Sequence, residues 1–121
     1  MNTALLTAAV LALLLAGAHS YLGERYILIR LFRKDALPTL FGGTEFTRST
    51  LRFAWHLTSV AWVGFAGLLV TLAAPGRLRA ADVIALTFGA SGLLALVGSK
   101  GHHLSWIVFF SISVLVWYGS R

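Results

Sequence analysis

Four apolar runs, each close to the length that crosses a lipid bilayer, constrain this chain more than any other feature. A spanning helix needs about 20 mostly apolar residues. The runs cover about residues 3–23, 50–74, 81–98 and 102–119. Lipid offers no partner for backbone polar groups, so each run must form a helix. The sequence therefore predicts an all-α fold, a four-helix transmembrane bundle with up-down-up-down helices, in one integral membrane domain over residues 1–121.

The composition excludes several other classes of protein. The chain is 58% hydrophobic and only 12% charged, whereas soluble domains carry about 25% charged residues. It has no cysteine, which excludes disulfides, thiolate metal sites and thiol catalysis. The net charge is +6, but the basic residues lie in the connections between apolar runs, so membrane lipids and not nucleic acid are the expected surroundings.

The first apolar run has one other interpretation, a cleaved secretory signal, because the small residues 16–18 resemble a signal-peptidase site. A secretory signal also has a positively charged beginning. The side chains of residues 1–3 carry no positive charge, so the run is interpreted as a first transmembrane span.

The distribution of basic residues predicts the orientation. Seven flank the connections after the first and third runs: Arg25, Arg30, Arg33, Lys34, Arg48, Arg52 and Lys100. Three flank the other side: Arg77, Arg79 and Arg121. The positive-inside rule places the first group in the cytoplasm, so residues 24–49 form a basic cytoplasmic connection and both termini lie on the non-cytoplasmic side. Residues 25–34 mix apolar and basic side chains, which indicates a helix that continues out of the membrane or lies at its surface.

Four histidines form the main candidate site. If the spans alternate in direction, His19, His56, His102 and His103 all lie toward the cytoplasmic leaflet. Glu24 and Arg52 are close to them in sequence, and Arg52 shares a helix face with His56 at i and i+4. Polar residues inside a membrane usually face a bundle interior or an aqueous cavity. This His/Glu/Arg polar cluster is therefore a candidate cofactor-binding or proton-handling site.

Several roles remain open for these histidines. They could hydrogen-bond across helices and only stabilise the fold. They could bind a metal ion through His19, His56 and His102, although no zinc-ligand spacing is present. His19 and His56 match in depth, as a bis-histidine haem requires, but neighbouring helices pack 8–10 Å apart, which is tight for a haem. Glu24, His19 and His56 could also relay protons.

Three short segments carry a family resemblance: residues 19–25 (HSYLGER), 51–58 (LRFAWHLT) and 101–106 (GHHLSW). They are similar to the signatures of small uncharacterised bacterial inner-membrane proteins with four spans, and the whole chain resembles the DoxX-like group in length and span number. This resemblance implies a multi-pass protein of the bacterial inner membrane and no particular activity. Small multidrug-resistance transporters are of similar size, but they carry a glutamate well inside the first span. Glu24 lies instead at its end.

No catalytic motif points to an enzyme, since the chain has neither a nucleophile elbow nor a phosphate-binding glycine loop. The expected function is therefore that of a small protein that acts through partners, as an accessory subunit of a larger membrane complex or as a homo-oligomer. Two alternatives remain: a redox protein with a histidine-ligated metal or haem, and a small proton-coupled transporter.

Overall fold

The computed structural model describes residues 1–76 and 78–121. Its regular elements in these residues are all helical, which confirms the all-α prediction. The elements are α1 (Thr3–Leu22), the π-helix η1 (Gly23–Leu28), α2 (Ile29–Leu31), α3 (Glu45–Ala73), α4 (Ala80–Gly98) and α5 (Ser105–Gly119). The first three follow one another without a break, so they form one continuous helix, Thr3–Leu31.

Three of the helices are long and apolar enough to cross a membrane: Thr3–Leu31, α3 and α4. The fourth apolar run also becomes a helix, but α5 has only 15 residues. At 1.5 Å per residue it is about 22 Å long, shorter than the roughly 30 Å hydrocarbon core of a bilayer. It begins at Ser105 and not at residue 102, because the chain first turns through His102, whose N–H donates to the carbonyl of Ser99 at 3.0 Å.

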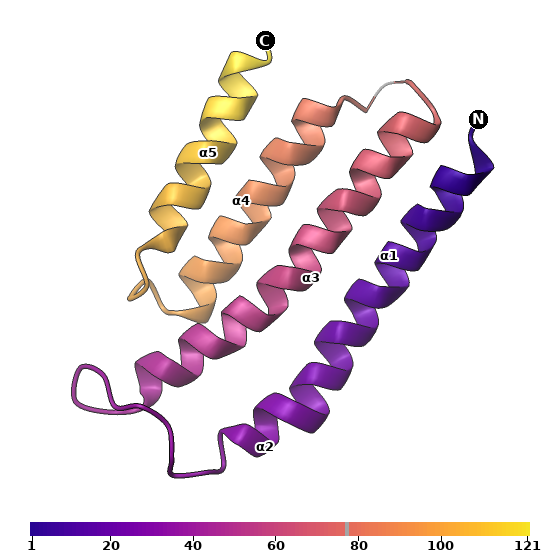
Figure 1. Ribbon diagram of the computed structural model, residues 1–121. Helices are drawn as coiled ribbons and strands as arrows, with labels where there is room; N and C mark the ends of the chain where they lie inside the picture. The colour runs from indigo at the N-terminus through magenta and orange to yellow at the C-terminus, as the bar shows by residue number, and fades with distance from the viewer. Residues whose placement is uncertain (77) are drawn as a thin grey trace.

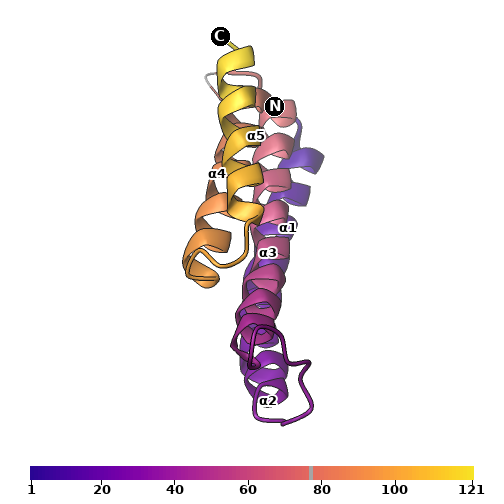
Figure 2. The same ribbon diagram turned by 90° about the vertical axis from the view of Figure 1, so that its left-hand side faces the viewer.

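The first two long helices extend beyond the other two at one end of the molecule (Figures 1 and 2). The first helix continues eight residues past the predicted end of its apolar run, and α3 begins at Glu45, five residues before its apolar run. A turn joins them, in which Leu40 and Gly43 exchange backbone hydrogen bonds of 2.8 and 3.3 Å. Phe41 and Gly42 adopt the positive φ angles, 55° and 89°, that this tight turn requires.

The helices form a single layer and do not surround a common axis. Figure 1 shows them side by side in the order α1, α3, α4, α5, and Figure 2 shows this layer from its edge. Within residues 1–76 and 78–121, α1 contacts α3, α3 contacts α4 and α4 contacts α5, while α5 contacts neither α1 nor α3. The arrangement therefore differs from the closed bundle expected from the sequence. The span pattern predicts helices, but it does not determine whether the first helix meets the last.

Both termini lie at the same end of the layer (Figure 1). The N–H of Asn2 donates to the carbonyl of Ala73 at 3.0 Å, which joins the start of α1 to the end of α3. Arg79 donates to the carbonyl of Ser120 at 3.1 Å and forms an ion pair with Asp82 at 2.8 Å. The hydrogen bonds that Arg79 donates to the Asp82 carboxylate raise the pKa of the guanidinium above its ordinary value. These contacts join the helix ends at the end of the layer that holds both termini. The opposite end, where the first helix and α3 extend beyond α4 and α5, is called the extended end.

Small residues fill the contacts between helices. The buried apolar positions include Ala9 and Ala16 of α1, Ala66 and Ala73 of α3, and Ala85 and Ala95 of α4. Ser91 and Ala95 of α4 and Ser99, which follows the helix, are spaced four residues apart and are buried at 6%, 0% and 2% exposure. Among the described residues, no large side chain falls below 2% exposure. Small residues let helix backbones approach closely in lipid. Many large apolar side chains are exposed, whereas Leu28, Phe32, Phe53 and Val83 are buried.

Two glycines show how close these approaches are. A Cβ atom added to Gly64 of α3 would lie 2.5 Å from Oγ1 of Thr87 in α4. One added to Gly92 of α4 would lie 2.9 Å from the ring of Phe110 in α5. Both distances are too short for ordinary van der Waals contact, so glycine at each position allows the neighbouring side chain to pack directly on the backbone.

Candidate functional site

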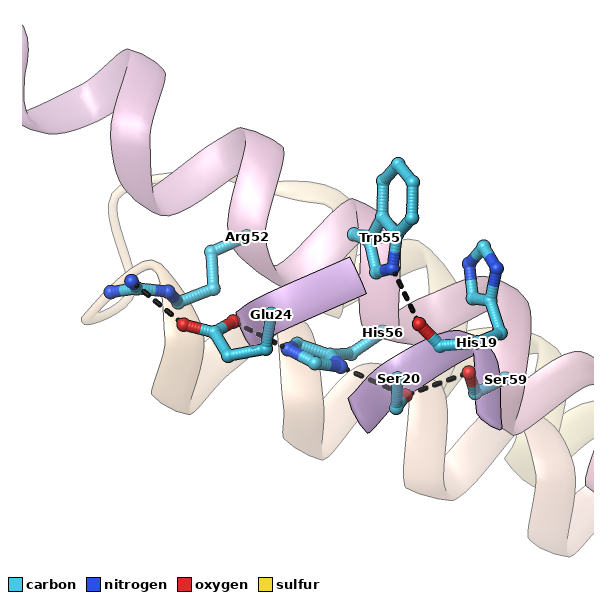
Figure 3. A network of polar contacts seen from close by, with 7 residues as sticks. All are labelled: His19, Ser20, Glu24, Arg52, Trp55, His56 and Ser59. Carbon is cyan, nitrogen blue, oxygen red and sulfur yellow. Dashed lines mark hydrogen bonds and ion pairs between the residues drawn. The ribbon is translucent and has the colours of Figure 1, made fainter. Parts of the chain in front are cut away.

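A continuous chain of polar contacts runs along the interface between α1 and α3 (Figure 3). Nη2 of Arg52 lies 2.9 Å from Oε1 of Glu24, and Nε2 of His56 lies 3.0 Å from Oε2 of the same carboxylate. Nδ1 of His56 lies 2.9 Å from the hydroxyl of Ser20, which lies 2.7 Å from the hydroxyl of Ser59. We call these five residues, Arg52, Glu24, His56, Ser20 and Ser59, the polar chain.

Helical spacing places the members of the polar chain on two facing helix surfaces. Ser20 and Glu24 are four residues apart on the first helix. Arg52, His56 and Ser59 follow one another at intervals of four and three residues on α3. Residues three and four apart share a helix face, so two adjacent antiparallel helices bring the five side chains into one row.

The first helix changes from α-helical to π-helical hydrogen bonding beside the polar chain. From Gly23 to Leu28 it is a π-helix, and the N–H of Ile29 donates to the carbonyl of Glu24, five residues earlier. Single π turns inside α-helices are frequent at functional sites. The Trp55 side chain of α3 packs directly on Gly23, since a Cβ atom there would overlap the indole ring. That indole donates from Nε1 to the carbonyl of His19 at 3.1 Å, so Trp55 supports the start of the π turn.

The polar chain lies near one edge of the apolar part of the helices. Counting about 20 residues from Thr3 reaches Leu22, and counting the same number back from Ala73 reaches Ala54. Glu24 and Arg52 lie just outside these limits, and His56 lies just inside. Their side chains are 31%, 50% and 26% exposed, respectively. The Glu24 carboxylate is thus shared between a permanent cation and a histidine, near the end of the apolar part of the two helices.

The polar chain can exist in two hydrogen-bonding directions. In the structure the Ser20 hydroxyl donates to Ser59. With neutral His56, Nε2–H donates to Glu24 and Nδ1 accepts from Ser20, so Ser20 must instead accept from Ser59. With protonated His56, both ring nitrogens donate, so Ser20 must accept from His56 and donate to Ser59. Uptake of one proton therefore reverses two hydrogen bonds without moving a heavy atom, which is the chemistry of a short proton relay.

His19 lies close to this site but is not part of it. Its ring stacks on Trp55 with centroids 4.6 Å apart and planes 1° from parallel, and it meets the edge of Trp62 at 4.9 Å. Its Nε2 atom is buried and has no hydrogen-bond partner within the described part of the chain. Figure 3 shows His19 beside Trp55, while His56 faces Ser20 and Glu24. The two imidazoles, matched in depth, do not face each other as bis-histidine haem ligation would require.

His102 and His103 occupy a third place, the connection between α4 and α5. The His103 ring packs against Phe46 and Phe53, with centroids 5.8 and 5.2 Å apart, and its Nδ1 lies 2.8 Å from the Ser105 hydroxyl. His102 is exposed, and its Nδ1 lies 3.0 Å from the carbonyl of Ser99. Since α5 does not contact α1, this pair is separated from the polar chain.

The predicted metal set His19, His56 and His102 is therefore not brought together by the fold. Apart from residue 77, which is not described, the structure contains no group of three or more His, Cys, Asp or Glu residues arranged to hold a metal ion. The physical reason is the single layer: α3 separates the first helix from the α4–α5 connection. Of the candidate residues, the structure joins Glu24, Arg52 and His56, leaves His19 and His103 packed against aromatic rings, and leaves His102 exposed.

Ser20 and the supporting role of Trp55 were not singled out from the sequence. Ser20 could have been found from the sequence, because it is four residues before Glu24 and so shares the helix face of that acid. No sequence pattern indicated the π turn, since its hydrogen-bond pattern depends on the close approach of Trp55 to Gly23.

No family model matches the chain, and the comparisons found no similar curated protein or solved structure. The resemblance to small four-span inner-membrane proteins therefore stays a prediction.

Coupling between Glu24 and His56 can be measured directly. In a double-mutant cycle of Glu24→Ala and His56→Ala, we expect a coupling of about 1 kcal/mol in the free energy of unfolding, since the pair is only partly exposed. The measurement is reversible unfolding in detergent micelles, followed by circular dichroism.

Asp35 supplies the matched control for this cycle, because it is an exposed carboxylate for which no ion pair is found among the described residues. The cycle of Asp35→Ala with His56→Ala should show no coupling. Equal coupling energies in the two cycles would contradict a direct Glu24–His56 contact.

Proposed function

We propose that this chain is a small multi-pass protein of the bacterial inner membrane that acts through other membrane proteins. It serves either as an accessory subunit of a larger complex or as a homo-oligomer. The observation that carries the proposal is the single layer of helices, in which each helix contacts only its neighbours along the chain. A single layer has no interior of its own in which to enclose a substrate.

The outward faces of the layer support association with protein. Large apolar side chains are exposed on every helix, for example Leu14 of α1 at 65%, Phe65 of α3 at 59%, Leu86 of α4 at 66% and Leu115 of α5 at 69%. Lipid can cover these side chains, but a layer one helix thick leaves far more of its surface available to a neighbour than a closed bundle does. In lipid, helix association depends on packing and on hydrogen bonds between helices, and both are available on an open face.

The polar chain supports the same proposal. Glu24 and His56 are about one-quarter to one-third exposed at the membrane edge. Charged and polar groups at this depth usually face other protein or a water-filled space. A neighbouring subunit that covered this part of the layer would complete their burial, and the polar chain would then fix the relative positions of α1 and α3 for that contact.

Charge asymmetry supports placing the extended end in the cytoplasm, with both termini on the non-cytoplasmic side. Seven of the ten basic residues lie at or near the extended end, as the positive-inside rule expects for cytoplasmic segments. The extension also carries exposed apolar side chains: Tyr26, Ile27 and Ile29 are 49%, 48% and 39% exposed. The guanidinium groups of Arg25 and Arg30 lie 5.7 and 5.6 Å from the Tyr26 ring centroid. This mixture suits a contact at the membrane surface.

The mass of the complex that this protein forms in the membrane tests the proposed function. The chain weighs 13.1 kDa. After crosslinking in intact membranes and extraction in mild detergent, native mass spectrometry should show either a multiple of that mass or a constant stoichiometry with a second membrane protein. The first result identifies a homo-oligomer and the second an accessory subunit. A monomer with no co-purifying partner, both with and without crosslinking, would contradict the proposal.

A second candidate function, a small proton-coupled transporter, is favoured by the polar chain alone. Glu24, His56, Ser20 and Ser59 form an unbroken sequence of hydrogen-bonding groups that leads from the membrane edge into the α1–α3 interface. Such a sequence can pass a proton inward, because each member can both accept and release one.

Proton flux into proteoliposomes tests the transporter. Under an imposed pH gradient, the parent protein should acidify the lumen faster than empty vesicles, as reported by a pH-sensitive dye. His56→Ala should abolish this flux because it interrupts the polar chain. His103→Gln, which alters a histidine on the other side of α3, should leave it intact. Absence of flux in the parent protein would end this candidate.

A further inference from the structure

A cleft of about 540 Å³ opens at the extended end of the layer, away from the polar chain. It lies between the tight turn that precedes α3 and the connection from α4 to α5. Its walls include Phe41, Glu45, Phe46, Ser49, Lys100 and His102. None of the five residues of the polar chain lines it. The volume falls within the usual range for sites that bind small molecules or headgroups.

The two walls of the cleft carry opposite charges. Glu45 contributes a carboxylate from the start of α3, and Lys100 contributes an ammonium group from the end of α4. Throughout the described part of the chain, neither residue forms an ion pair. Nδ1 of His102 donates to the Ser99 carbonyl at 3.0 Å, which leaves Nε2 of the neutral ring as an acceptor. The cleft is therefore lined by one anionic and one cationic side chain, Glu45 and Lys100, each with unused hydrogen-bonding capacity.

Two aromatic rings add an apolar surface beside Glu45. Phe41 and Phe46 meet edge to face, with ring centroids 5.0 Å apart. Phe41 is 90% exposed, although it is a large apolar residue. The face of an aromatic ring attracts cations, so these rings favour a positively charged group on the side of the cleft that already carries the carboxylate.

The turn at each wall of the cleft contains residues in a left-handed backbone conformation. Phe41 and Gly42 have φ angles of 55° and 89°, and Lys100 and Gly101 have φ angles of 51° and 80°. Positive φ is uncommon for residues other than glycine. The second turn is held by the hydrogen bond from the N–H of Gly101 to the carbonyl of Leu96 at 2.8 Å. Two defined turns thus keep the charged walls apart without a direct contact between them.

One wall of the cleft begins where the apolar part of α4 ends. Counting about 20 residues from Ala80 along α4 reaches Ser99, so Lys100 and His102 lie just beyond the apolar part of the helix. A ligand at this depth can combine a polar group in the cleft with an apolar part in the bilayer.

We infer that this cleft binds a phosphate ester bearing a primary amine, the chemistry of an ethanolamine phospholipid headgroup. Lys100 donates hydrogen bonds to the phosphate, and Glu45 accepts hydrogen bonds from the ammonium group beside the Phe41 and Phe46 rings. A purely anionic headgroup leaves Glu45 without a partner and is repelled by it. A quaternary amine has no N–H to donate to Glu45. This binding site goes beyond the proposed function and does not depend on it.

Lipid retention by the full chain tests the site. The protein is reconstituted with equal amounts of phosphatidylethanolamine, phosphatidylcholine and phosphatidylglycerol, and bound lipid is counted by native mass spectrometry. Phosphatidylethanolamine should be retained about tenfold more than either of the others, the ratio expected for one hydrogen-bonded charge contact. Equal retention of the three lipids, or preference for phosphatidylglycerol, would overturn the proposal.

Two variants test the contributions of the two cleft walls to lipid binding separately. Glu45→Gln should remove the preference for phosphatidylethanolamine over phosphatidylcholine, because only the amine contact is lost. Lys100→Asn, chosen because asparagine tolerates positive φ, should lower the retention of both lipids. The matched controls are Asp35→Asn and Lys34→Gln, which remove the same charges outside the cleft and should change neither ratio. Equal effects of Glu45→Gln and Asp35→Asn would contradict the site.

Soluble phosphoethanolamine distinguishes the two sources of this headgroup chemistry. Displacement of the retained lipid by soluble phosphoethanolamine at millimolar concentration supports the cleft as a site for the headgroup alone. Retained preference without displacement supports the phospholipid itself as the ligand.

Discussion

Close contact between small residues along each helix pair is the constraint on which this structure depends. Lipid is as apolar as a leucine side chain, so helices in a membrane gain little by burying large apolar residues against one another. Here alanine, glycine and serine occupy many of the contacts, as at Ala95 and Ser99, and most of the leucines are exposed, although Leu28 and Phe53 are buried. Because each contact is satisfied by two neighbouring helices, four helices can form a stable layer without closing into a bundle.

The polar chain follows from the same close contact. The first helix reaches Trp55 without an intervening side chain only because position 23 is glycine. That approach accompanies the π turn, and Glu24 meets both Arg52 and His56 just beyond its start. A carboxylate at the edge of a membrane needs partners, and this geometry supplies two. The site is therefore a product of the packing.

The sequence predicted the helices well because their apolar runs are long, and it placed α4 to within one residue. It could not predict the single layer, because hydrophobicity does not reveal which helices meet. The mixed apolar and basic residues 25–34 predicted a helix that continues out of the membrane or lies at its surface, and the first helix does continue to Leu31. The sequence overestimated the fourth helix, because His102 to Leu104 form a turn. At the site, the i and i+4 spacing of Arg52 and His56 predicted that the two residues share a helix face, and both contact Glu24. The orientation of the His19 ring depends on its stacking against Trp55. The spacing of residues along the sequence could not predict that orientation.

Disulfide formation between introduced cysteines tests the single layer most directly, since the native chain has no cysteine. A Gly89→Cys/Ser113→Cys pair across α4 and α5 should form an intramolecular disulfide in membranes, because a Cβ atom at position 89 lies 3.2 Å from the Ser113 hydroxyl. Cysteines at Leu11 of α1 and at Ser111 or Val114 of α5 should form none, since α1 and α5 do not touch. Disulfides between copies are recognised by their doubled mass. An intramolecular α1–α5 disulfide as efficient as the α4–α5 one would show a closed bundle and contradict this account.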